Sequence, residues 1–124
     1  MLYKRSEYFR YTFGKPLDAK FRIVMGEAEE QKSKKGDCTL VDLSPGGAKL
    51  LAEFDIPFSR DAVNIQLEFT LYQAKIEVLG TLVWKESYQK DFLYGFDFEE
   101  DLEKEQLIVA ELKLLRKSES SEKQ

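Results

Sequence analysis

The chain has no histidine and a single cysteine, Cys38, among its 124 residues. Without histidine, Ser–His and Cys–His nucleophile pairs cannot form within the chain, and the commonest general base is missing. One cysteine is not a zinc-ligand set and allows no internal disulfide. These absences argue against most hydrolytic enzymes. We therefore expect a protein that is not an enzyme, needs no cofactor and works in a reducing compartment, the cytoplasm.

Long apolar runs are missing as well, so no membrane insertion is expected. The first residues, 1–5, lack the apolar stretch of a secretory signal. Hydrophobic residues make up 43% of the chain and charged residues 34%, which is the composition of a globular protein. The length predicts one domain over residues 1–117, followed by a disordered polar tail at 118–124.

Charge is unevenly distributed along the chain, whose net charge is −4. Residues 1–22 contain six basic side chains and only two acidic ones. This basic segment on an acidic protein indicates a local anion site. The acidic remainder would repel a long polyanion, so a nucleic-acid polymer is not expected as a partner.

Alternation of apolar and polar residues predicts six strands, which form an antiparallel barrel or sandwich. The predicted strands cover residues 17–25, 38–43, 48–54, 63–71, 74–84 and 92–98. Cys38 and Trp84 fall at core positions of this pattern, and Gly80 predicts a bulge or bend. Helical spacing of apolar residues then predicts a terminal helix over 101–117.

The stretch Asp42–Gly47 joins two of the predicted strands. Pro45 presets the backbone for a turn, and Gly46 accepts the positive φ of a type II turn. Asp42 and Ser44 can bond their own backbone, while Gly47 allows a close approach of another group. A side-chain-capped hairpin turn explains these residues, and so does a loop that holds an anion with N–H groups and the serine hydroxyl.

Two arginines near the N-terminus, Arg5 and Arg10, favour the anion-binding interpretation. Arginine pairs bidentately with phosphate, stacks on aromatic planes and pairs with the O6/N7 edge of guanine. A ligand with guanine bases and phosphates would use all three properties. Asp42 can accept a hydrogen bond from a guanine N–H or hold an arginine in place.

These residues resemble the PilZ domain family, whose two motifs are R-x-x-x-R and [D/N]-x-S-x-x-G. The quoted segments are 5–10 and 42–47, and residues 80–84 and 94–98 are similar to the closing strands of the family; the resemblance covers most of residues 4–98. It implies a six-stranded antiparallel PilZ-type β-barrel (residues 15–98) with an N-terminal arginine arm (1–14) and a C-terminal helix (101–117). It also implies a receptor for cyclic di-GMP, with ligand contacts at Arg5, Arg10, Asp42, Ser44, Gly46 and Gly47.

The second motif matches the family pattern fully, but the first does not, because four residues rather than three separate Arg5 from Arg10. Either Arg5 reaches the ligand through a small bulge, or one arginine is missing and binding is weak or lost. In the first case we expect a cyclic di-GMP receptor that changes its N-terminal arm and signals through an unidentified protein effector. In the second we expect a protein-interaction module in motility, biofilm or surface-appendage regulation. The sequence leaves the oligomeric state open.

Overall fold

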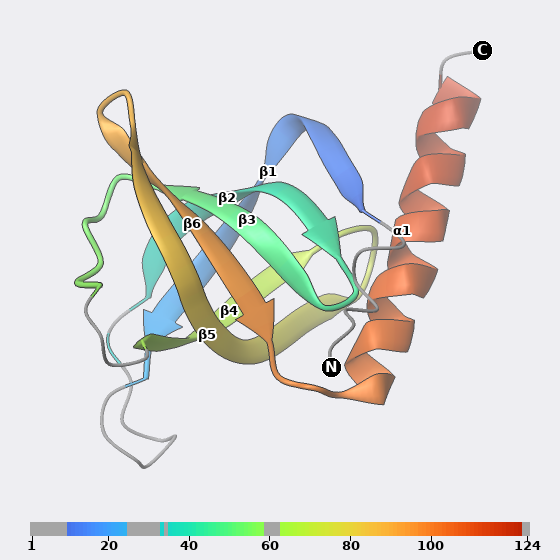
Figure 1. Ribbon diagram of the computed structural model, residues 1–124. Coiled ribbons are helices and arrows are strands. Elements are labelled where there is room, and N and C mark those ends of the chain that lie inside the picture. The colour runs from blue at the N-terminus through green and yellow to red at the C-terminus, as the bar shows by residue number, and fades with distance from the viewer. Residues whose placement is uncertain (1–9, 25–32, 34, 59–62, 123–124) are drawn as a thin grey trace.

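The computed structural model describes residues 10–24, 33, 35–58 and 63–122, which form a closed antiparallel barrel with a helix beside it (Figure 1). The elements are β1 (Tyr11–Ile23), β2 (Gly36–Ser44), β3 (Gly47–Ala52), β4 (Val63–Thr70), β5 (Lys75–Tyr88), β6 (Asp91–Phe98) and α1 (Leu102–Glu122). Around the barrel the strand order is β1-β2-β3-β6-β5-β4, and β4 closes on β1. The predicted barrel with a terminal helix is confirmed.

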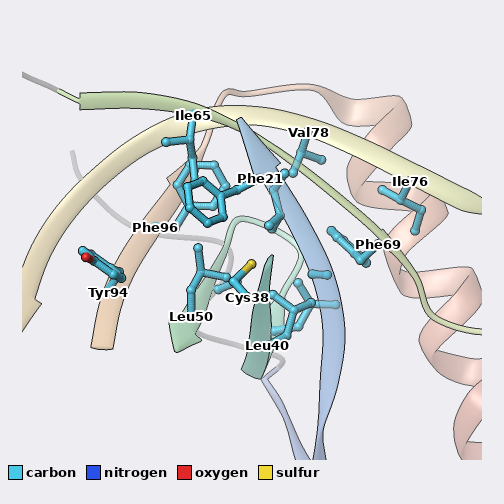
Figure 2. Close-up of a cluster of buried hydrophobic side chains, with 14 of the residues drawn as sticks. Phe21, Cys38, Leu40, Leu50, Ile65, Phe69, Ile76, Val78, Tyr94 and Phe96 are labelled. Atoms are coloured by element: carbon cyan, nitrogen blue, oxygen red, sulfur yellow. The ribbon is translucent and has the colours of Figure 1, made fainter. Parts of the chain in front are cut away.

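The barrel interior is filled by the apolar residues of the period-two pattern, including Phe21, Leu50 and Phe96 (Figure 2). Alternate side chains of a strand point to opposite faces, so one face of each strand supplies the core. Cys38 lies in this core, as predicted. Burial, with the nearby charge of Asp37 adding to it, raises the pKa of the Cys38 thiol to about 12, so the thiol stays protonated at neutral pH.

Helix α1 packs against one end of the barrel, beside the β4–β5 loop and the β2–β3 turn (Figure 1). Ile108 and Leu112 place their side chains in the core and are fully inaccessible to solvent. At the start of the helix, the Asp101 carboxylate accepts a hydrogen bond from the Lys104 N–H at 3.2 Å, which satisfies one of the unpaired N–H groups of the first turn.

The buried carboxylate of Glu111 connects the helix to the β4–β5 loop through hydrogen bonds. Its Oε1 atom accepts hydrogen bonds from the N–H groups of Tyr72, Gln73 and Ala74 at 2.9–3.0 Å. Burial alone would raise the pKa of Glu111, but the three hydrogen bonds to the ionised form outweigh it and lower the pKa. Glu111 therefore remains charged while it is 3% exposed.

The largest departures from the expected ranges are at three ends, and the other ends differ by at most two residues. Strand β1 begins at Tyr11, inside the segment assigned to the N-terminal arm, and β5 continues to Tyr88. Helix α1 extends to Glu122, so the prediction of a disordered tail from residue 118 is wrong for 118–122.

At Gly80 the backbone of β5 comes very close to that of β6. A Cβ at this position would overlap the backbone oxygen of Asp97 and press on the Phe96 ring. The predicted irregularity occurs nearby, because the register between β5 and β6 shifts between Leu82 and Trp84. This one-residue shift moves Trp84 to the outer surface, where it is 38% exposed, so its predicted core position is wrong.

Substituting Gly80→Ala is expected to lower the free energy of unfolding by about 2 kcal/mol, because backbone rather than a flexible side chain must give way. The measurement is the urea midpoint at constant slope. Gly14→Ala is the matched control, since a Cβ at Gly14 meets nothing within 4 Å. An equal loss in both variants would contradict the close approach at Gly80.

Candidate functional site

On the outer surface of the barrel, near the start of β1, two cationic side chains contact the same carboxylate. Arg10 Nη1 lies 2.6 Å from Asp42 Oδ1, and Lys49 Nζ lies 3.7 Å from Asp42 Oδ2. The Asp42 side chain is only 8% exposed, whereas those of Arg10 and Lys49 are 45% and 38% exposed. Asp42 therefore holds an arginine, one of its two predicted roles, while both cations keep donors that face solvent.

Strand pairing places this cluster in a row that runs from strand to strand across the outer surface of the barrel. Asp42 of β2 is opposite Lys49 of β3, which is opposite Gly95 of β6. Gly95 is in turn opposite Trp84 of β5, and a Cβ at Gly95 would overlap the indole ring. The indole therefore lies over β6 at Gly95. Neighbouring strands are about 4.8 Å apart, so this position is one strand away from Lys49. We call Arg10, Asp42, Lys49 and Trp84 the outer row.

The β2–β3 turn brings the remaining predicted motif residues together. Ser44 and Gly47 are paired, with Pro45 and Gly46 between them. The Ser44 hydroxyl is fully buried and donates to the Gly47 carbonyl oxygen at 3.2 Å. The Gly46 carbonyl accepts a hydrogen bond from the Phe98 N–H at 2.9 Å. In this structure these residues stabilise the turn and connect it to β6 by hydrogen bonds.

The close approach predicted at Gly47 is present, and the approaching group is the backbone of β6. A Cβ at Gly47 would lie 2.7 Å from the carbonyl oxygen of Phe96. Of the other predicted site residues, Arg5 lies outside the described residues. The described part of the chain contains no group of cysteine and carboxylate side chains that could hold a metal ion.

Tyr11, the residue that follows Arg10, connects the site to the helix. Its hydroxyl donates a hydrogen bond to Glu119 Oε1 at 2.5 Å, and its ring packs edge-on against Phe13. Partial burial, followed by the hydrogen bond to Glu119 and the charge of that carboxylate, raises the pKa of Tyr11 to about 12. The first residues of β1 therefore contact Asp42 on one side and the last turns of α1 on the other.

Two residues of the outer row, Lys49 and Trp84, were not predicted as site residues. Lys49 is the polar residue between Ala48 and Leu50, a position that indicates an outward side chain but no partner. The position of Trp84 follows from the register shift in β5, which the apolar pattern does not reveal. Only cross-strand pairing brings either residue near Asp42.

The fold and the motif agree with a comparison against protein families. The model of the PilZ domain matches residues 4–115, which is nearly the whole chain. The chain therefore belongs to the PilZ domain family, a family of domains that bind cyclic di-GMP and are not catalytic. A comparison with curated proteins finds no match. Within the described residues, no helix combines the length and apolar character needed to cross a membrane.

Proposed function

We propose that this protein is a cyclic di-GMP receptor that binds the nucleotide on the outer row and signals through a protein partner. One observation carries the proposal: Asp42, the first residue of the second family motif, holds the exposed cations Arg10 and Lys49 side by side. With two cations and one carboxylate, the cluster has a positive charge on a chain of net charge −4. A dianionic ligand suits such a cluster.

Each member of the outer row has a distinct role in this proposal. The Arg10 guanidinium contacts a phosphate bidentately or the O6/N7 edge of a guanine. Lys49 contacts a phosphate as a point charge, and Asp42 positions both cations. The exposed face of Trp84 stacks on a base, an interaction that does not depend on a particular hydrogen-bond pattern.

The remaining motif residues act through the turn and through the N-terminal arm. The path of the β2–β3 turn is fixed by Ser44, Gly46 and Gly47. Asp42 and Lys49 are therefore held directly opposite each other on the two strands of the hairpin. Arg5 is proposed as an additional cation that the arm brings to the nucleotide. The single buried cysteine agrees with a cytoplasmic location for this receptor.

The proposal is tested by calorimetric titration with cyclic di-GMP at physiological salt, together with fluorescence. Trp84 is the only tryptophan, so any change in indole emission reports on the outer row. We expect saturable binding in the micromolar range or tighter, with quenching that follows the same isotherm. Absence of heat and of thermal stabilisation at high ligand concentration would refute the receptor function.

A second candidate function is a PilZ interaction module without the nucleotide, acting in motility or surface-appendage regulation. It is favoured by the Ser44 hydroxyl, which is buried and already bonded to Gly47. The irregular spacing of Arg5 and Arg10 points the same way. In this case the titration gives no binding, and deleting Ser6, which restores the family spacing, is expected to create affinity.

A further inference from the structure

A surface groove of about 800 Å³ opens where strands β2 and β3 separate. Pairing between these strands ends at Thr39 and Leu51. Beyond that point β2 pairs only with β1, as far as Gly36, and β3 pairs only with β6, as far as Ala52. Along the described residues, the β3-facing side of Asp37 and Cys38 therefore has no strand beside it. An uncovered strand side of this kind accepts an added extended segment.

The groove has an apolar floor of small side chains and an acidic rim. Three buried residues lie at the bottom: Ala19, Cys38 and Ala52. Leu51 and Phe54 add larger apolar surface, and Phe54 is 54% exposed. Five charged side chains line the groove, four carboxylates and one lysine: Asp18, Asp37, Glu53, Asp91 and Lys20.

The charge of the rim determines which ligands fit. Lys20 is paired with Asp37, so no unpaired cation lines the groove among the described residues. A cleft lined by charge of one sign concentrates ligands of the other sign. Nucleic acid, phosphate groups and acidic lipid surfaces are therefore repelled, whereas lysine and arginine side chains are attracted.

We propose that the groove between β2 and β3 is a docking site for an extended segment of a partner protein in which basic and apolar residues alternate. Successive side chains of an extended chain point to opposite faces. One set contacts Leu51 and Phe54, while the other reaches the rim carboxylates. The proposal stands on the groove alone and does not require nucleotide binding.

The location of the groove also relates it to the outer row. Leu51 is two residues along β3 from Lys49, a separation of about 7 Å. A partner segment lying in the groove therefore ends near Leu51, two residues from Lys49. A nucleotide on the outer row and a partner in the groove would therefore be neighbours on the surface of β3.

The test is a titration of the isotopically labelled full chain, at low ionic strength, with a heptapeptide of alternating lysine and valine. The readout is the set of backbone amide signals, and we expect saturable shifts at Thr39, Leu51 and Ala52. A heptapeptide of alternating glutamate and valine serves as the matched probe and is expected to leave these signals unchanged. In the double variant Glu53→Gln/Asp91→Asn, which leaves the Lys20–Asp37 pair intact, the lysine peptide should bind roughly fivefold more weakly.

The control variant Glu86→Gln/Glu103→Gln removes two exposed carboxylates that do not line the groove. It should bind the lysine peptide like the wild type. Equal weakening in both double variants, or shifts that never saturate, would show charge attraction without a site and overturn the proposal. Concentration-dependent shifts of the same amides without peptide would assign the groove to a second copy of the chain, which also overturns it.

Discussion

The variant Glu111→Ala is expected to lose about 3 kcal/mol of stability, since three backbone N–H groups lose a charged acceptor at once. Each hydrogen bond to a charged group contributes about 1.5–3 kcal/mol, and water entering beside the exposed Tyr72 and Gln73 recovers part of the sum. The measurement is urea unfolding followed by circular dichroism. Lys113→Ala, an exposed position on the same helix, is the control and should change stability by less than about 0.5 kcal/mol.

The variant Glu111→Gln separates charge from shape, because it keeps an oxygen that can accept the same hydrogen bonds. The folded-state pKa of Glu111 lies below the ordinary value of a glutamate side chain. Its contribution to stability is therefore fully present above the unfolded-state pKa and is lost as pH falls through the folded-state pKa. The glutamine variant should be less stable than the wild type at neutral pH, and the difference should shrink in acid. A constant difference at every pH would contradict the role of the charge.

The second large effect is expected for Arg10→Ala, which should weaken cyclic di-GMP binding by roughly ten- to a hundredfold. The guanidinium is the nearest cation to Asp42 and has donors to spare for the ligand. Calorimetric titration measures the change. Arg10→Lys keeps the charge but not the planar fork, so it should fall between the alanine variant and the wild type.

Lys15→Ala is the matched control for this experiment. Lys15 is an exposed cation of β1, the strand that begins directly after Arg10, and it is not a member of the outer row. Its removal lowers the net charge as much as Arg10→Ala does, so an equal loss of affinity in the two variants would mean general attraction rather than contact. Unchanged binding by Arg10→Ala would exclude the arginine from the site.

The strands were predictable where one face is buried without interruption. Val63 to Thr70 is an example, since every second residue from Ile65 to Phe69 enters the core. The start of β1 was missed because Gly14, Lys15 and Pro16 interrupt the alternation, and the structure has a register irregularity between Thr12 and Leu17. Local patterns contain no signal for a strand that continues through such an interruption.

The error at Trp84 has a similar origin. A single extra residue between Leu82 and Trp84 moves every following side chain of β5 to the opposite face.

The last turns of α1 were missed for another reason, because the serine-rich sequence after Lys117 has weak helix propensity. The contact of Glu119 with Tyr11, which no local pattern shows, lies in this part of the helix.

The candidate site was predictable only where it is a contiguous motif. Asp42 and Ser44 stand out in the sequence because a turn places carboxylate, hydroxyl, proline and glycine together. Lys49 and Trp84 join them through pairings between strands, and those pairings depend on the register of the whole barrel. The role of Glu111 as a buried hydrogen-bond acceptor could not be predicted from the sequence either, since its partners lie 37–39 residues away.

Arg10 and Tyr11 are consecutive residues, but their bonds respond to different solution conditions. The Arg10–Asp42 pair joins two full charges, one of them nearly half exposed, and weakens as ionic strength rises. Tyr11 donates a neutral O–H, and with a pKa of about 12 it keeps this proton throughout the physiological pH range. Rising salt therefore loosens the barrel side of this short segment and spares its helix side. The ionic composition of the surroundings thus decides which of its two neighbours holds the start of β1 more firmly.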